Sequence, residues 1–216
     1  MSQRDTLIIF VKNPEKGKVK TRLASVSGDD AALRIYQLLL EKTRSAALGV
    51  ECSRLLCYSE YVPATDDWPD AAFLKAVQAP GDLGQRMTSA FHRAFLSGAQ
   101  KAIIIGSDCP ELDSRLIREA FEALDNTDFV IGPARDGGYY LLGMKQFTPE
   151  IFREIPWSTA TVAEDTFRII HSLDKEYTLL PQLSDIDEYE DWISYASAHP
   201  DAGKEFISDV ILRAKK

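Results

Sequence analysis

The chain has 216 residues, of which 45% are hydrophobic and 27% charged, and its formal net charge at pH 7 is −8. That length allows one domain with a sizeable core, and the composition is typical of a soluble globular protein. The acidic balance, with a pI near 5.0, argues against a nucleic-acid-binding protein, because binding to a phosphate backbone needs a broad positive surface.

The three cysteines, Cys52, Cys57 and Cys109, include no CxxC pair. An odd number of thiols without that motif predicts reduced cysteines in a cytoplasmic protein, not a disulfide framework or a zinc site. The first apolar run, TLIIFV at 6–11, is too short for the core of a signal peptide, and no run approaches the length of a membrane span. We therefore expect a cytoplasmic protein without a membrane-spanning segment.

Short apolar runs alternate with segments of helical period along the chain. In chain order, the expected elements are a strand at 6–11, a helix at 29–48, strands at 53–59 and 73–79, a helix at 82–99, a strand at 101–108, a helix at about 113–124, and strands at 128–134, 138–144 and 177–183. Asp29 or Asp30 is expected to open the first helix. The alternation predicts an α/β fold with a mainly parallel sheet, whose ligands bind at the carboxyl ends of the strands.

A basic stretch, VKNPEKGKVKTRL at 11–23, lies directly past the first predicted strand. Its five basic side chains face only Glu15, which gives a local charge of +4. Lysine offers a point charge and arginine a planar fork, and both suit phosphate oxygens. The stretch is not a P-loop, because GKVKT lacks the required Gly-Lys-Ser/Thr. A solvated surface loop is the alternative, but the position beyond a buried strand favours an anion site.

An acidic residue, Asp108, ends the apolar run in IIIGSDCPEL at 103–112. A carboxylate at this edge of the sheet suits Mg²⁺ or Mn²⁺, which prefer oxygen ligands and often bridge to substrate phosphates. The alternative role for Asp108 is a helix cap. Asp113 is the better cap candidate, because it directly precedes the next helical stretch.

Two further acidic stretches allow either a ligand site or an ordinary structural role. In GPARDGGYYLLG at 132–143, the glycines after Asp136 permit close approach of a ligand, although a hairpin turn is the favoured interpretation from the sequence alone. In SDIDEYEDW at 184–192, Asp185 and Asp187 share a face if the segment is extended. Such a pair can complete a metal site, but acidic residues before a helix are ordinary, and spacing alone favours that explanation.

A glycine-framed stretch, APGDLGQRM at 79–87, precedes the second predicted helix. The free N–H groups at the start of a helix favour anions or polar ligand atoms. A plain entry into the helix is the alternative.

Six stretches, taken together and in this order, resemble a bacterial family of glycosyltransferase-A-like proteins: FVKNPEKGKVKTRLA, GDLGQRM, GSDCPEL, GPARDGGYYLLGM, IPWST and LSDIDEYED. That family is associated with sugar transfer, including arsenosugar biosynthesis. The first stretch is also similar to the N-terminal loop of 2-phospholactate guanylyltransferase. The resemblance runs through nearly the whole chain. It implies a single nucleotide-diphospho-sugar transferase domain over residues 1–216, with a mixed sheet, a nucleotide pocket and a bound Mg²⁺ or Mn²⁺.

The resemblance also implies roles for individual residues. It places Lys12, Lys20 and Arg22 at the phosphates of the nucleotide, with Lys20, Arg22 and Asp108 taking part in catalysis. The nucleobase would be supported by Gly81, Leu83 and Gly84. Metal ligands would be Asp108 and Asp187, with Asp185 as the neighbouring candidate. The sugar or acceptor would be lined by Asp136, Gly137 and Gly138.

The sequence departs from the wider superfamily in two places. A lysine-rich loop replaces the usual glycine-rich opening loop, and the Asp-x-Asp of glycosyltransferases is present as SDC, with one acid.

We expect glycosyl transfer from a nucleotide-diphosphate sugar to a small-molecule acceptor. Nucleotidyl transfer with release of pyrophosphate, as in a guanylyltransferase, is the alternative. A nucleotide-binding protein without catalytic activity is a second alternative.

Overall fold

The computed structural model describes residues 5–200. Its seven strands are β1 (Asp5–Val11), β2 (Ser53–Tyr58), β3 (Leu74–Val77), β4 (Lys101–Ile105), β5 (Phe129–Pro133), β6 (Tyr139–Met144) and β7 (Tyr177–Leu179). They form one sheet in the order β3-β2-β1-β4-β6-β5-β7. Neighbouring strands are parallel except where β6 pairs antiparallel with β4 and with β5. The expected α/β fold with a mixed, mainly parallel sheet is confirmed.

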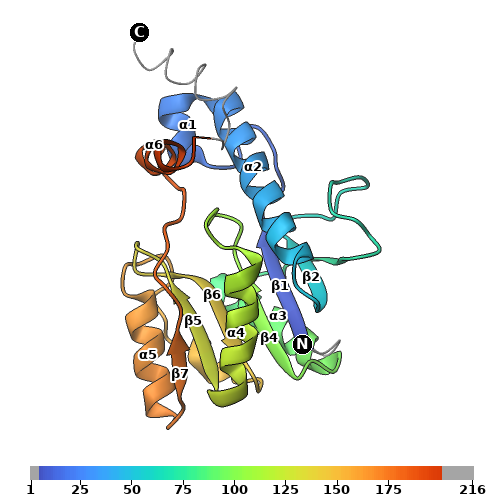
Figure 1. Cartoon of the computed structure of the whole chain (residues 1–216), viewed down its shortest axis with the longest axis vertical. Coiled ribbons are helices and arrows are strands. Elements are labelled where there is room, and N and C mark those ends of the chain that lie inside the picture. The colour runs from blue at the N-terminus through green and yellow to red at the C-terminus, as the bar shows by residue number, and fades with distance from the viewer. Residues whose placement is uncertain (1–4, 201–216) are drawn as a thin grey trace.

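Helices flank the sheet on both faces (Figure 1). They are α1 (Thr21–Ser27), α2 (Asp29–Leu48), α3 (Leu83–Leu96), α4 (Ser114–Asn126), α5 (Val162–Ser172) and α6 (Tyr189–Ala198), with a 3₁₀ turn η1 (Pro149–Phe152). No helix within residues 5–200 is long and apolar enough to cross a membrane. The single domain expected over 1–216 includes residues 1–4 and 201–216, which lie outside the described residues.

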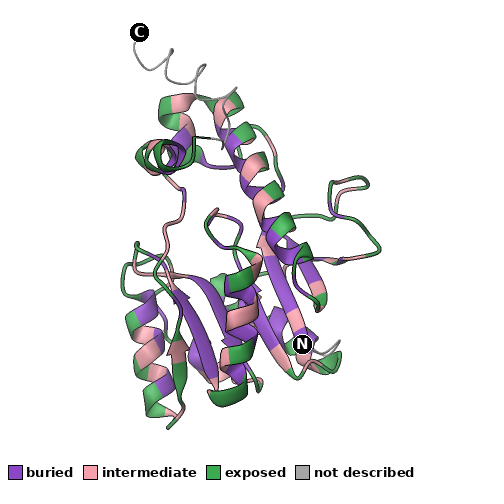
Figure 2. Cartoon of the chain, in the orientation of Figure 1, coloured by how far each residue is buried: buried purple, intermediate pink, exposed green. Residues whose placement is uncertain are grey.

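Two apolar layers hold the helices to the sheet. Alternate residues of β1 point to opposite faces, so Leu7 and Ile9 join the layer under α2, α4 and α6, whereas Ile8 joins the layer under α3, η1 and α5. The central strands are buried along most of their length (Figure 2). The continuous apolar runs in the sequence arise because both faces of these strands are covered.

The predicted elements are found close to their expected positions. Helix α2 begins at Asp29, as expected, with Gly28 as its N-cap and Asp29 and Asp30 in its first turn. The short helix α1 was not predicted, because it lies partly in the basic stretch and has only seven residues. Asp113 is the N-cap of α4, and its side chain accepts a hydrogen bond from the Leu116 N–H at 2.9 Å.

Two connections determine what lies at the carboxyl edge of the sheet. The turn after β5 closes an antiparallel hairpin with β6, in which the Ala134 N–H donates to the Gly138 carbonyl at 3.0 Å. The hairpin interpretation of the Asp-Gly-Gly stretch is therefore confirmed. After β7 the chain crosses this edge and forms α6, which packs against α1 (Figure 1). The last described helix therefore lies beside the first.

Replacement of Gly143 by alanine is expected to strain the centre of the sheet. A Cβ at Gly143 would lie 2.6 Å from Val130 Cγ1 and 2.8 Å from Ile103 Cγ1, both on neighbouring strands. Gly143→Ala should lower the free energy of unfolding by about 1–3 kcal/mol, as measured by urea denaturation. Gly106→Ala is the matched control, because nothing lies within 4 Å of its Cβ position; it should change stability by no more than about 0.5 kcal/mol. Equal stability of the two variants would contradict the packing argument.

Candidate active site

A cleft of about 770 Å³ lies at the carboxyl edge of the sheet. Its volume falls in the range of small-molecule sites. The predicted site residues that line it are Lys12, Lys20, Arg22, Leu83, Asp108, Asp136, Gly138, Asp185 and Asp187. The structure therefore brings together residues that are up to 175 positions apart, from Lys12 to Asp187.

Three predicted glycines, Gly81, Gly84 and Gly137, support the walls of the cleft instead of lining it. The Gly81 carbonyl accepts a hydrogen bond from Arg86 Nε at 2.8 Å. A Cβ at Gly84 would lie 2.6 Å from the Trp157 indole, and one at Gly137 would lie 1.9 Å from the carbonyl oxygen of the loop before α5. Gly84 and Gly137 thus allow close approaches that a side chain would block, whereas Gly81 is needed for its backbone, which has φ 112°.

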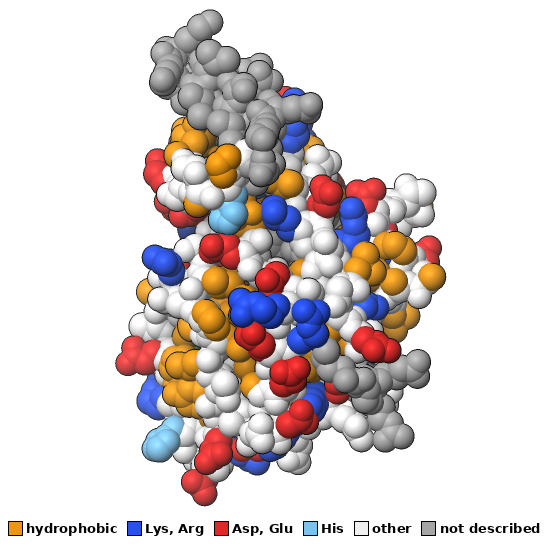
Figure 3. All heavy atoms as spheres, viewed as in Figure 1, with side chains coloured by type: hydrophobic (Ala, Val, Ile, Leu, Met, Phe, Trp, Pro, Cys, Tyr) orange, Lys and Arg blue, Asp and Glu red, His pale blue; other side chains and the backbone are white. Residues whose placement is uncertain are grey.

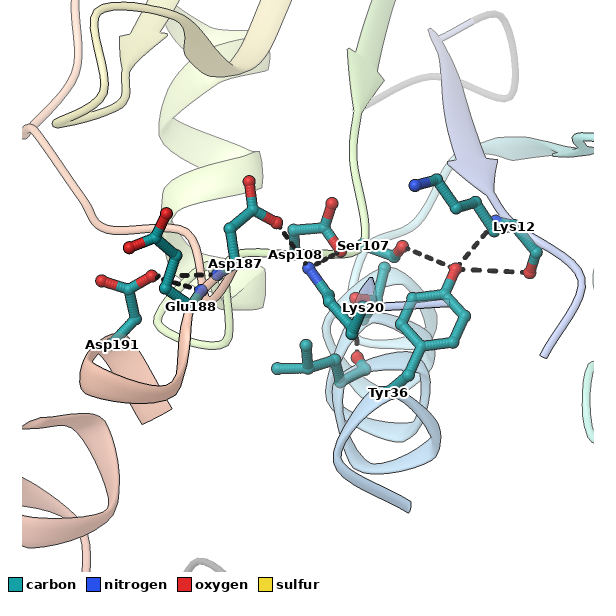
Figure 4. Close-up of polar contacts among 10 residues, drawn as sticks. Lys12, Lys20, Tyr36, Ser107, Asp108, Asp187, Glu188 and Asp191 are labelled. Atoms are coloured by element: carbon teal, nitrogen blue, oxygen red, sulfur yellow. Dashed lines mark hydrogen bonds and ion pairs between the residues drawn. The ribbon is translucent and has the colours of Figure 1, made fainter. Parts of the chain in front are cut away.

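At the centre of the cleft, Lys20 pairs with two aspartates (Figure 4). Its Nζ lies 2.6 Å from Asp108 Oδ1 and 2.9 Å from Asp187 Oδ1. The Lys20 side chain is only 5% exposed, whereas those of Asp108 and Asp187 are 38% and 50% exposed. The ammonium is therefore buried behind carboxylates that face the cleft.

Three local structures place these side chains. Lys20 is the N-cap of α1 and has a left-handed backbone with φ 49°, a conformation that costs a non-glycine residue energy and often occurs at functional sites. Asp108 follows β4, and its carbonyl accepts a hydrogen bond from the Ile186 N–H at 2.9 Å. Asp187 precedes α6, where its N–H donates to the Asp191 carboxylate at 3.1 Å.

The electrostatics of the cluster follow from its burial and its charges. Burial acts to lower the pKa of Lys20, but Asp108 and Asp187 outweigh it and raise that pKa, so the ammonium stays charged. Burial acts to raise the pKa of Asp187, yet Lys20 and then the more distant Lys12 and Arg22 lower it.

Asp185 behaves differently from its neighbours. Burial, followed by the charges of Asp108, Asp136 and Asp187, raises the pKa of Asp185 to about 7. It makes no hydrogen bond or ion pair with Lys20, which bonds to Asp187 instead. Between the two aspartates of this segment, Asp187 is therefore the geometric partner of Asp108.

The basic stretch divides into two sets of side chains. Lys16 pairs with Asp30, and Lys18 pairs with Glu15 and Glu60, all on the surface. In contrast, the side chains of Lys12 and Arg22 line the cleft and make no ion pair or hydrogen bond with any residue in the described part of the chain. On the face seen in Figure 3, basic and acidic side chains are interspersed. The unpaired cations are thus directed to the cleft.

Tyr36 holds the two sides of the cleft together, a role that the sequence did not indicate. Its hydroxyl accepts a hydrogen bond from the Lys12 N–H at 2.7 Å and lies 3.2 Å from Ser107 Oγ (Figure 4). Tyr36 is 1% exposed, and its helical spacing in the sequence is that of an ordinary core residue. It connects the residue after β1 with the residue before Asp108.

Other lining residues were also missed. Gln78 follows β3, and its Nε2 donates to the carbonyls of Val11 and Cys57 at 3.3 and 3.0 Å. Arg86 and Trp157 line the same wall. No signal in the sequence indicated Gln78, because it lies inside the strand predicted at 73–79, whereas the observed β3 ends at Val77. For Trp157 the signal was its place in IPWST, one of the six stretches that carry the family resemblance; it reaches the cleft from the loop before α5.

The residues at the centre fit a divalent cation with few protein ligands. Among residues 5–200 no group of three or more His, Cys, Asp or Glu side chains is arranged to hold a metal. Asp108 and Asp187 nevertheless converge on a single cationic group. Mg²⁺ commonly binds through one or two carboxylates together with waters and substrate phosphates. The donor set is therefore suited to an ion that arrives with phosphate.

Solved structures place the fold among the nucleotide-diphospho-sugar transferases. A protein from Desulfovibrio desulfuricans, provisionally classed as a nucleotide-diphospho-sugar transferase, is 34% identical over 87% of this chain and 84% of its own, with a TM-score of 0.78. A 4-diphosphocytidyl-2C-methyl-D-erythritol synthase from Anaerococcus prevotii shares the fold at 12% identity, covering 92% and 96% of the two chains, with a TM-score of 0.57. The expected resemblance is confirmed.

The chain belongs to the bacterial family described as "Uncharacterized protein conserved in bacteria (DUF2064)", which matches residues 43–159. No curated protein matches the chain. A Mycobacterium tuberculosis protein, solved as a complex with manganese, shares the fold at 16% identity over 90% of this chain and 98% of its own, with a TM-score of 0.50.

Removal of the Tyr36 hydroxyl is expected to loosen the cleft. Tyr36→Phe leaves the Lys12 N–H without its partner, so the free energy of unfolding should fall by about 1–3 kcal/mol. Nucleoside diphosphate affinity, measured by calorimetry, should fall roughly tenfold. Tyr58→Phe is the control. The hydroxyl of this buried tyrosine donates a 2.7 Å hydrogen bond to Asp66, and Tyr58 does not line the cleft. It should lose stability but keep its affinity. Equal binding by both variants would contradict the role given to Tyr36.

Proposed function

We propose that the chain is a metal-dependent transferase that uses a nucleotide-diphosphate sugar and moves the glycosyl group to a small-molecule acceptor. The observation that carries this proposal is the meeting of two carboxylates and two cations in one cleft at the carboxyl edge of the sheet, where neither cation has an ion-pair partner among residues 5–200. The transferase class is supported by the 34% identical relative and by the fold shared with cytidylyltransferases.

In this proposal the basic residues recognise the diphosphate. Lys12 and Arg22 contact its oxygens directly, because neither has a competing partner among residues 5–200. Lys20 adds a third charge from the adjacent helix start. Such cations, fixed before the reaction, stabilise the negative charge that develops on a departing phosphate.

Asp108 and Asp187 would hold the divalent ion, with Asp185 beside them. When bound, Mg²⁺ or Mn²⁺ supplies neutralisation of phosphate charge. Manganese is supported by the solved relative of the same fold that contains it.

The remaining predicted residues are assigned to the two ends of the ligand. Leu83, with Gly81 and Gly84 behind it, would support the nucleobase, where Gln78 presents its amide oxygen without a partner among the described residues. Asp136 and Gly138, with Gly137 behind them, would face the sugar or the acceptor.

Nucleotidyl transfer is the second candidate, and two observations favour it. The fold is shared with a 4-diphosphocytidyl-2C-methyl-D-erythritol synthase and with a synthetase solved in complex with CTP, and the lysine-rich loop suits a triphosphate.

We further propose that the chain works as one domain in the cytoplasm. The free thiols of Cys52, Cys57 and Cys109 support that location.

Asp108→Asn is expected to abolish metal-dependent nucleotide binding. The change keeps the shape of the side chain but removes one of the two negative charges that would face the ion. Binding of nucleoside diphosphates would be titrated with Mn²⁺ and with a chelator, and circular dichroism would check the fold. Asp113→Asn is the control, because Asp113 caps α4 outside the cleft. Metal-dependent binding by Asp108→Asn at wild-type affinity would show that Asp108 is not a ligand.

Arg22→Ala should weaken phosphate binding selectively. Loss of charge-assisted hydrogen bonds worth about 1.5–3 kcal/mol lowers affinity by about one to two orders of magnitude. The loss should appear with a nucleoside diphosphate and be small with the nucleoside. Lys16→Ala is the control, because Lys16 pairs with Asp30 on the surface. If the affinities of the protein for the nucleoside diphosphate and for the nucleoside fall equally, Arg22 has a structural role.

The released phosphate species distinguishes the two reactions. The protein would be incubated with Mg²⁺ or Mn²⁺, a panel of nucleotide sugars, nucleoside triphosphates and small hydroxylated acceptors. Glycosyl transfer releases a nucleoside diphosphate. Release of pyrophosphate that depends on Asp108 would replace the first candidate with the second. Binding without turnover of any panel member would favour a nucleotide-binding protein.

A further inference from the structure

The Lys20 ammonium occupies the position between Asp108 and Asp187 in which a bound metal cation is expected. Its Nζ is 2.6 and 2.9 Å from one oxygen of each carboxylate. Figure 4 shows those two oxygens turned toward the ammonium and the other two turned away from it. The lysine is more deeply buried than either aspartate, so it already supplies the counter-charge that the pair requires.

We propose that Lys20 is the resident cation of the Asp108–Asp187 pair, and that a divalent ion binds this pair only together with a phosphate ligand that draws the ammonium away. The inference rests on the proposed function, because it concerns the same two carboxylates. It adds a coupling between the two ligands, because the metal ion binds only when a phosphate ligand binds with it.

Charge balance is the first reason. Two carboxylates and one ammonium leave a single net negative charge, and a divalent ion placed against the pair would be repelled by the nearby ammonium. A phosphate group removes that conflict, because it offers the ammonium a new anionic partner and offers the metal further oxygen ligands.

The position of the unpaired cations is the second reason. Lys12 and Arg22 line the same cleft as Lys20, Asp108 and Asp187. A phosphate bound by these two side chains therefore lies within the electrostatic range of Lys20. The Lys20 backbone is at the start of α1, two residues before Arg22. A modest movement of its side chain exchanges the carboxylates for phosphate.

A permanent clamp is the competing explanation for Lys20. In that case the ammonium would hold the two carboxylates at the right separation, and its removal would weaken metal binding. The two explanations predict opposite changes in the affinity of the ligand-free protein for Mn²⁺.

The test measures Mn²⁺ binding by electron paramagnetic resonance with and without inorganic diphosphate. Wild-type protein should bind Mn²⁺ weakly alone and at least about tenfold more tightly with diphosphate. Lys20→Met should bind Mn²⁺ alone roughly tenfold more tightly than wild type, because two carboxylates lose their counter-ion. Lys18→Met is the control: it removes a charge from the same stretch, but Lys18 pairs with Glu15 on the surface. Its Mn²⁺ affinity should not change.

Unchanged or weaker Mn²⁺ binding by Lys20→Met overturns the inference and favours the clamp. The wild-type titration gives a second check that does not depend on the folding of a variant: tight Mn²⁺ binding without diphosphate also overturns it. If wild type binds Mn²⁺ in neither condition, the proposed metal site fails and the inference fails with it. If wild type shows the diphosphate effect but Lys20→Met does not bind Mn²⁺ more tightly, only the inference fails.

Discussion

The site depends on the balance of one buried ammonium against two carboxylates. Lys20 comes from the start of α1, Asp108 from the end of β4 and Asp187 from the segment before α6. The Lys20 charge is not stable in its position alone, because a buried charge needs a partner. The ion cluster therefore joins three parts of the chain and fixes where α1 and α6 begin relative to the sheet.

The architecture explains why such a cluster forms at this edge. Parallel strands β1 and β4 end side by side, so the loops that follow them face one cleft. The antiparallel strand β6 brings the Asp136 turn to the same edge, because a hairpin returns the chain where β5 ends. Mixing one antiparallel strand into the sheet thus adds a third segment to the site.

Much of the fold could be predicted from local pattern. The apolar run at 6–11 and the first part of the run at 101–108 form the buried strands β1 and β4, because both faces are covered, and the cap at Asp113 is set by its neighbours in sequence. The short helix α1 could not be predicted, since its stability comes from packing against α2 and α6. The role of Tyr36 was hidden for a related reason, because its helical spacing is that of any core residue.

The sequence by itself determined the chemistry available at the edge of the sheet: basic residues after the first strand and acidic residues after the fourth and near the C-terminal end. Only the tertiary structure decided how those charges are used. It paired Lys16 and Lys18 with surface acids and buried Lys20 between two aspartates, while Lys12 and Arg22 have no ion-pair partner among residues 5–200. The physical reason is that ion pairing depends on separation in space, and Lys20 and Asp187 are 167 residues apart in the chain.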